Sequence, residues 1–190
     1  KETEKGHCLR GALYLRVAGN QPSEFTTTTP RAAHVVDWAC KSQRHVVRST
    51  FAAELLSAGD AADQGILLSQ MFQEVLKGPM SAMQARDSRM LGGYLLPMVL
   101  YVDAMSVFAA VTATFIKTPA EKSLLCHVQY LRELLDQRIL SALAWLDTRD
   151  MIADGLTKGA VSREGLLALM DGTTKILHAP KIWTAKRIGA

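Results

Sequence analysis

Cysteine is scarce in this sequence, and its three positions lie far apart. Cys8, Cys40 and Cys126 are odd in number, and no two of them form a Cys-x-x-Cys pair. This pattern argues against a disulfide framework and against a zinc finger, because both need paired or clustered cysteines. We therefore expect reduced thiols and an intracellular location, either cytoplasmic or nuclear.

Long apolar runs and a signal peptide are also missing. No run approaches the roughly 18 apolar residues that a membrane-spanning helix needs. Residues 1–7 contain no apolar core, and no initiator methionine precedes them. We therefore expect a soluble chain without a membrane partner, cut from a longer polypeptide.

Positive charge is only slightly in excess. The chain has 22 basic and 18 acidic residues, which give a formal net charge of +4. This excess permits an acidic partner such as nucleic acid but does not establish one. The length of 190 residues suits one domain with a substantial core. We expect that domain over residues 1–172 and a basic tail over residues 173–190.

The most informative segment that is present is the apolar run at residues 95–105. It is rich in aliphatic and β-branched residues and follows a pair of glycines, a composition that predicts a buried central strand. Asp103 stands near its end, where α/β sheets place their binding sites. Alternatively, Asp103 caps the helix expected after it, and this segment alone does not decide between the two.

Two strands and several helices are expected around this run. Residues 8–17 and 33–41 alternate as strands do, and the loop between them indicates an antiparallel pair. The other expected elements are a loop over residues 78–93, helices over residues 106–114, 120–137 and 161–170, and a strand over residues 139–146. The fold class is therefore mixed α/β.

A long helix is expected over residues 51–77, with Ser49 and Thr50 offering hydroxyls to cap its start. One face of this helix carries small side chains, which allows it to lie close to a sheet. Glu54 is the only acid on that face, and it either serves a site or merely complements the helix dipole. The face consists of Glu54, Ala58, Ala61 and Gly65.

Four short motifs occur in a definite order along the chain. They are residues 38–43 (Trp-Ala-Cys-Lys-Ser-Gln), 48–54 (Arg-Ser-Thr-Phe-Ala-Ala-Glu), 101–106 (Tyr-Val-Asp-Ala-Met-Ser) and 153–158 (Ala-Asp-Gly-Leu-Thr-Lys). Together they resemble the ribonuclease H domain of copia-type LTR retrotransposon polyproteins, over about residues 9–158. Each motif alone is weak, whereas four in sequence are fairly specific. The resemblance implies a ribonuclease H-like mixed sheet flanked by helices.

The resemblance also implies an activity, which is Mg²⁺-dependent cleavage of the RNA strand of RNA–DNA hybrids in reverse transcription. The implied partners are the hybrid and the reverse transcriptase region of the same polyprotein. The family holds two Mg²⁺ ions, replaceable by Mn²⁺, with four carboxylates, and three of them carry over to Glu54, Asp103 and Asp154. Two such ions activate a water and stabilise the leaving oxygen at a phosphodiester, and oxygen ligands suit Mg²⁺.

One departure from the family concerns its first aspartate, which lies in the opening strand. No aspartate precedes Asp37, and Asp37 falls on a later strand of the pattern. We therefore expect the first strand to be truncated upstream of Lys1, with Glu2 or Glu4 replacing the missing acid only by accident. This fragment would then bind metal weakly and turn over slowly. The presence of Ala104, where the family usually has asparagine, is a milder departure.

Substrate contacts are expected in two places. The basic connector before Glu54 offers charged and hydroxyl groups to backbone phosphates, although a solvated basic loop explains it equally well. Thr157 and Lys158 either position a phosphate or only cap and flank a helix. The connector residues are Lys41, Ser42, Gln43, Arg44, Arg48 and Ser49.

Two rival interpretations stay open. The first is a catalytically inactive ribonuclease H-like remnant that binds nucleic acid or packs against a reverse transcriptase, which the missing first aspartate suggests. The second is another nuclease or an integrase of the same fold. The sequence does not decide whether the element is active, which sequences it prefers or how many copies associate.

Overall fold

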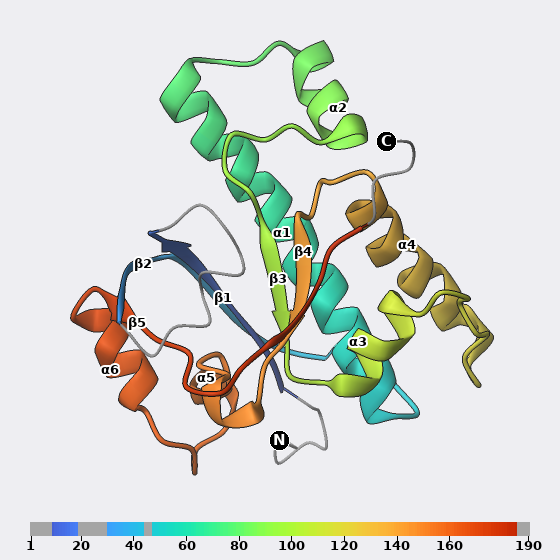
Figure 1. Cartoon of the computed structure of the whole chain (residues 1–190), viewed down its shortest axis with the longest axis vertical. Helices are drawn as coiled ribbons and strands as arrows, with labels where there is room; N and C mark the ends of the chain where they lie inside the picture. Colours follow the sequence, from blue (N-terminus) through green and yellow to red (C-terminus); the bar gives the residue numbers. More distant parts are fainter. Residues whose placement is uncertain (1–8, 19–29, 44–46, 186–190) are drawn as a thin grey trace.

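The computed structural model describes residues 9–18, 30–43 and 47–185. Within them the chain forms a mixed α/β fold with two three-stranded sheets (Figure 1). The strands are β1 (Leu9–Val17), β2 (Arg31–Ser42), β3 (Val99–Val102), β4 (Ala142–Trp145), β5 (Thr173–Thr174) and β6 (Lys181–Trp183). The helices are α1 (Thr50–Lys77), α2 (Ala82–Leu91), α3 (Met105–Thr112), α4 (Leu125–Asp136), α5 (Asp154–Thr157) and α6 (Glu164–Met170), with 3₁₀ turns η2 (Lys122–Leu124) and η3 (Thr148–Asp150).

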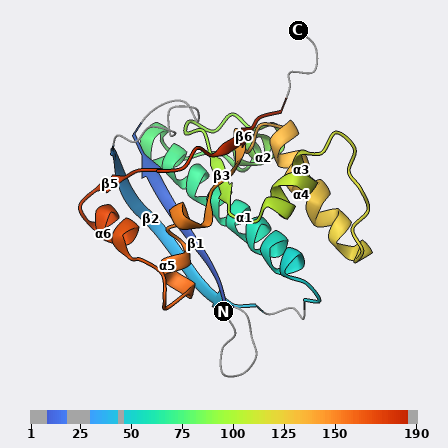
Figure 2. The ribbon, with the colours of Figure 1, turned by 60° about the horizontal axis from the view of Figure 1, so that its bottom comes forward.

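The first sheet has the order β1-β2-β5 and is antiparallel throughout. The expected antiparallel pair of strands is therefore confirmed, with a register shift between Tyr14 and Leu15. Helices α5 and α6 pack on β1 and β2, while α1 also packs against β1. Figure 2 shows α1 on the other side of this sheet from α5 and α6.

The second sheet has the order β3-β4-β6, with β3 parallel to β4 and β6 antiparallel to it. The prediction of a buried central strand at residues 95–105 is wrong in two respects. The strand covers only Val99–Val102, and it lies at the edge of its sheet with Val102 as its one buried residue. The physical reason is that the side of β3 away from β4 borders a cleft instead of another described strand.

Helix α1 joins the two sheets and begins where the sequence predicts. The Ser49 side chain accepts a hydrogen bond from the backbone N–H of Ala52, as an N-cap does. The helix ends at Gly78, whose φ of 95° is a conformation that glycine adopts at little cost. One face of α1 packs with α3, α4 and the second sheet in the main core. The largest fully buried side chains there are Leu55, Val107, Val111, Val128, Leu131, Leu135, Leu140 and Leu143.

Two further expectations need correction. The loop expected over residues 78–93 contains α2, which begins with a capping box between Ser81 and Gln84. None of the residues of α2 is buried, so no apolar stripe marks it in the sequence. The separate tail expected from Thr173 pairs with both sheets, through β5 and β6. Residues 186–190 of that tail lie outside the described residues.

The helices of the described ranges differ from membrane-spanning helices in length or in hydropathy. None of them is both long and apolar enough to cross a bilayer. The longest, α1, has 28 residues but carries charged side chains along its length.

Candidate functional site

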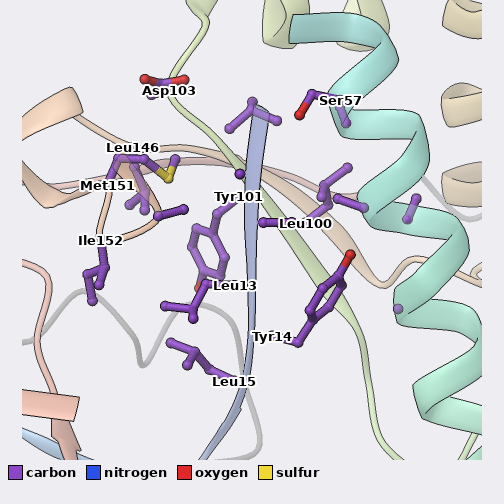
Figure 3. Close-up of a pocket in the computed structure, with 18 of the residues that line it drawn as sticks. Leu13, Tyr14, Leu15, Ser57, Leu100, Tyr101, Asp103, Leu146, Met151 and Ile152 are labelled. Carbon is purple, nitrogen blue, oxygen red and sulfur yellow. The ribbon is translucent and has the colours of Figure 1, made fainter. Parts of the chain in front are cut away.

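A cleft of about 770 Å³ lies between the two sheets. Its walls are β1 and β3, and α1 closes it on one side. Figure 3 shows the cleft, with Leu13, Tyr14 and Leu15 on β1, Leu100 and Tyr101 on β3, and Ser57 on α1. All four residues of the predicted small-residue face of α1 line this cleft. They are Glu54, Ala58, Ala61 and Gly65.

The three predicted acidic residues come from three separate elements and all line this cleft. Glu54 lies in the second turn of α1, where the residue keeps contact with solvent while the protein around its carboxyl group desolvates that group in part. Asp103 directly follows β3, and its backbone carbonyl accepts a hydrogen bond of 2.8 Å from the indole N–H of Trp145. Asp154 is the first residue of α5. The fold therefore gathers acids that are distant in the sequence.

Asp103 does not cap the helix that follows it. The N-cap position of α3 is Ala104, which provides no side-chain hydrogen bond. Asp103 is therefore not the N-cap of α3, and its carboxyl group accepts hydrogen bonds from the backbone N–H groups of Asp103 and Ala104.

The position of Asp154 depends on a close approach between α5 and β1. Gly11 of β1 faces this helix, and a Cβ atom added there would lie 2.9 Å from the Cγ2 of Thr157 and 3.3 Å from the carbonyl oxygen of Ala153. The thiol of Cys40 on β2 also donates a hydrogen bond of 3.3 Å to the carbonyl oxygen of Leu156. Small residues on the first sheet thus bring Asp154 to the cleft.

The acids influence one another electrostatically. Burial raises the pKa of Glu54, and the charges of Asp103 and Asp154 raise it further against the opposing effect of Lys158. Burial also raises the pKa of Asp103, and the charge of Asp154 adds to this, while Lys158 and backbone N–H groups oppose it. Both carboxyl groups therefore lie within an excess of negative charge.

Lys158 is the cation of this cluster. Its ammonium lies 2.6 Å from Oδ2 of Asp154, four residues earlier in the chain. Burial disfavours the charged amine, but the hydrogen bond that it donates to Asp154 and the charges of all three acids outweigh burial and raise the pKa of Lys158. The ammonium therefore stays protonated and neutralises part of the acidic charge.

The donor set fits a hard divalent cation in its chemistry, because carboxylate oxygens are the ligands that Mg²⁺ prefers. A cation would also relieve the repulsion that raises the pKa of Glu54 and Asp103. As the side chains stand, no three His, Cys, Asp or Glu residues in the described ranges are grouped closely enough to hold one ion. Glu54, Asp103 and Asp154 would therefore need side-chain rearrangement or a further donor.

Two other acids in this region already accept hydrogen bonds from other parts of the protein. Asp37 lies on β2 and accepts hydrogen bonds from its neighbour Trp38 and from the Gln64 amide at 3.0 Å. Asp150 lines the cleft, but its Oδ2 accepts a hydrogen bond of 2.7 Å from the backbone N–H of His178. Glu2 and Glu4 lie outside the described residues.

The predicted substrate-binding residues divide into two groups. Arg48, Ser49, Thr157 and Lys158 line the cleft. Lys41 and Ser42 are exposed at the end of β2 and are not among its lining residues. Arg44 lies outside the described residues.

Both hydroxyl groups of the first set already hold local structure. Ser49 caps α1, and the Thr157 hydroxyl lies 3.5 Å from the carbonyl oxygen of Asp154. Of the predicted substrate-binding residues, Arg48 and Lys158 are the cationic ones that line the cleft, which Arg10, Arg16, Arg31 and Lys175 also line.

Trp145 and the burial of Gln43 were not anticipated. Trp145 fixes the backbone at Asp103, and only its place at the end of a strand hints at this role. Gln43 is only 6 % exposed, although it stands in a polar connector. Neither its amide nitrogen nor its amide oxygen has a hydrogen-bond partner among the described residues, and no local pattern reveals this.

Comparison of the chain with protein-family models, with curated proteins and with solved structures gives no match. The resemblance to the ribonuclease H family therefore rests on the four motifs and on the placement of their residues.

Proposed function

We propose that this chain is a ribonuclease H-like domain of a copia-type retrotransposon polyprotein. The observation that carries the proposal is that Glu54, Asp103 and Asp154 line one cleft and act on each other electrostatically. These are the acids that the motif order marks. In this proposal the fold belongs to the ribonuclease H class, and the two sheets are parts of its mixed sheet.

The proposed reaction is hydrolysis of the RNA strand of an RNA–DNA hybrid. Two Mg²⁺ ions would supply the activation of water and the stabilisation of the leaving oxygen. Glu54, Asp103 and Asp154 would hold these ions. Mn²⁺ would be able to substitute for Mg²⁺ at the same site. Arg48 and Lys158, at the same cleft, would contact backbone phosphates.

The proposed substrate is a hybrid because its recognition needs no sequence readout. A protein distinguishes such a duplex by its shape and by the 2′-hydroxyl groups of one strand. The proposed partner is the reverse transcriptase region of the same polyprotein, which would generate the hybrid.

A second candidate function is an inactive remnant that binds hybrids without cleaving them. Two observations favour it. Lys158 occupies Oδ2 of Asp154, and no three potential ligands in the described ranges are grouped for a metal ion. A third possibility is another nuclease or an integrase of the same fold, which would act on a different nucleic-acid substrate.

The experiment that separates these functions is cleavage of labelled duplexes by the chain and by a version extended upstream, each with Mg²⁺ or with EDTA. We expect Mg²⁺-dependent cleavage of the RNA in the hybrid by the extended version, and none of duplex DNA. Asp103→Asn should lower the rate by more than about 100-fold, since it removes a metal ligand. The matched control is Asp87→Asn, which alters an exposed acid on α2.

Cleavage that persists in EDTA or in Asp103→Asn would contradict the enzyme proposal. Hybrid binding without cleavage in both versions would favour the remnant. Cleavage of duplex DNA in preference to the hybrid would favour a different nuclease.

A further inference from the structure

Strand β2 has a long open edge on the side of the first sheet that faces away from the cleft. On its other side β2 pairs with β1 over residues 33–42. On the open side β5 pairs only with Arg31 and Ala32, and the N–H of Ala33 donates a hydrogen bond of 2.8 Å to the carbonyl oxygen of Gly172. Beyond this point no strand of the described ranges pairs with the open side of β2.

The backbone groups that face this open side follow from the pairing with β1. Opposite residues of antiparallel strands alternate between pairs that exchange hydrogen bonds and pairs that do not. Ala33 directs its N–H to the side of β5, so its pair with Val17 exchanges none. Every second residue of β1 from Val17 belongs to the same class, and the partners of these residues include Trp38 and Cys40. Trp38 and Cys40 therefore direct their N–H and C=O groups away from β1.

The hydrogen bond of Trp38 agrees with this direction. Its backbone N–H donates to the side chain of the preceding residue, Asp37, at 2.8 Å. The other oxygen of this carboxylate accepts a hydrogen bond of 3.0 Å from the Gln64 amide on α1. Within the described ranges no side chain serves the N–H of Cys40 in this way. The edge thus keeps backbone groups that are free to bind a further strand.

The edge also exposes apolar surface. Trp38 is 62 % exposed, and Val35 on the same strand is also exposed. Tryptophan is enriched among the residues that contribute most to binding at protein interfaces. An open edge with apolar side chains readily pairs with another chain.

The charges along the edge indicate which chain that is. Asp37 and Lys41 carry opposite charges and lie four residues apart, so they share one face of β2. Lys41 is exposed and makes no ion pair within the described ranges. When two copies of β2 pair antiparallel about Ala39, Asp37 of each copy lies opposite Lys41 of the other. Opposite residues of such a pair are close enough for an ion pair.

The same register satisfies the backbone. It places Trp38 of one copy opposite Cys40 of the other, and both residues direct their groups outward, so they can exchange two hydrogen bonds. A register centred on Trp38 or on Cys40 would keep such bonds but would lose the ion pairs of Asp37 with Lys41. Hydrogen bonding and charge together therefore select the register centred on Ala39.

The helices leave room for a second copy. A two-fold axis through Ala39 gives both copies the same surface at the contact. Helices α1 and α5 both pack against β1, which is one strand in from this edge. The two β1 strands would lie three strand spacings apart, or about 14 Å. This separation exceeds the roughly 8–10 Å between packed helices.

We propose that the open edge of β2 binds the same edge of a second copy of this chain. The two strands pair antiparallel about Ala39, and the first sheets of the two copies form one continuous sheet. The partner is a second copy because the edge is complementary to itself in charge and in hydrogen bonding. The contact lies on the far side of the first sheet from the cleft, so the proposal does not depend on nuclease activity.

The first test measures sedimentation equilibrium and amide hydrogen exchange of the full chain over a dilution series. We expect a dimer that dissociates on dilution. Exchange at the Cys40 amide should be slower in the dimer by about tenfold or more, because this amide becomes hydrogen-bonded. The matched control is the Ala39 amide, which points toward β1 and should be protected in monomer and dimer alike.

The second test changes the charges of the edge. Lys41→Asp places like charges opposite each other and should weaken the dimer by about tenfold or more. Asp37→Lys should act in the same way, whereas a mixture of the two variants should form a mixed dimer with restored affinity. Lys117→Asp is the matched control, since it makes the same change of net charge at an exposed position outside β2 and should keep the dimer. Circular dichroism verifies that each variant is folded.

A chain that stays monomeric at every concentration would overturn the proposal. A dimer that Lys41→Asp leaves intact would also overturn it, because another surface would then form the contact. The same holds if the mixture of folded variants fails to associate, or if protection of the Cys40 amide persists in the monomer. These readouts involve no metal or hybrid, so they distinguish failure of this inference from failure of the proposed function.

Discussion

At the scale of single residues, the acids of the cleft work against the stability of the fold. The pKa values of Glu54 and Asp103 are raised chiefly by burial and then by neighbouring acids, so the folded state prefers their protonated forms. A carboxyl whose pKa is higher in the folded state loses protons more readily on unfolding. The free energy of unfolding therefore falls as the pH rises from the unfolded pKa through the folded pKa.

A first prediction follows from this direction. Asp103→Asn and Glu54→Gln should each raise the thermal unfolding midpoint near pH 7, by about 2–4 °C for every kcal/mol of relieved repulsion. The gain should disappear below about pH 4, where these carboxyls are protonated in the unfolded chain as well. Thermal unfolding monitored by circular dichroism across pH measures both effects. A gain that is the same at all pH values, or that Asp87→Asn also gives, would count against the explanation.

A second prediction concerns Trp145, whose indole N–H holds the carbonyl oxygen of Asp103. Trp145→Phe keeps an aromatic ring but removes the donor, so the free energy of unfolding should fall by about 1 kcal/mol or more. The carboxyl signal of Asp103 should also shift in NMR spectra, since its backbone is no longer fixed. Trp38→Phe is the control, because Trp38 is 62 % exposed and its loss should change neither quantity. If the two substitutions had identical effects, Trp145 would have no specific role in positioning Asp103.

At the scale of elements, a third prediction compares two glycines. Gly11→Ala should lower the free energy of unfolding by about 1–3 kcal/mol, because its Cβ would crowd α5. Gly59→Ala should raise it by about 0.5–1 kcal/mol, since Gly59 lies inside α1 with nothing within 4 Å of an added Cβ. Denaturant unfolding measures both changes.

The same pair of variants reports on the site. Displacement of α5 in Gly11→Ala should move Asp154 away and lower the pKa of Asp103, whereas Gly59→Ala should leave that pKa alone. An unchanged carboxyl titration of Asp103 in Gly11→Ala would contradict the placement of Asp154 by this contact.

Elements with a strong local signal could be predicted from the sequence. Ser49 marks the start of α1, the small residues up to Gly65 mark its cleft face, and alternation marks β1 and β2. The edge position of β3 could not be predicted, because its apolar composition is that of a central strand and its environment is set by distant residues. Helix α2 was missed because it buries nothing, although Ser81 and Gln84 gave a capping signal. Strands β5 and β6 are too short to show a period.

The acids of the site could be named from motifs, but their gathering at one cleft could not follow from spacing. Asp154 reaches the cleft on α5, which lies against Gly11 and Cys40 of the first sheet. The ion pair of Asp154 with Lys158 depends on the turn that α5 makes. Long-range contacts of this kind leave no local trace in the sequence.

At the scale of the whole molecule, the two sheets share α1 and leave a cleft between their open edges. Glu54, Asp103 and Asp154 line this cleft, so the proposed chemistry takes place between the two sheets.

In the proposed function, Glu54, Asp103 and Asp154 form a site for divalent cations. The most direct measurement is paramagnetic broadening by Mn²⁺ of the carboxyl carbon signals in NMR spectra of the full chain. We predict that these three signals broaden at Mn²⁺ concentrations that leave Asp87 and Asp147 sharp, and that excess Mg²⁺ restores them. Broadening spread evenly over all five carboxyls, or absent from the three, would contradict the claim.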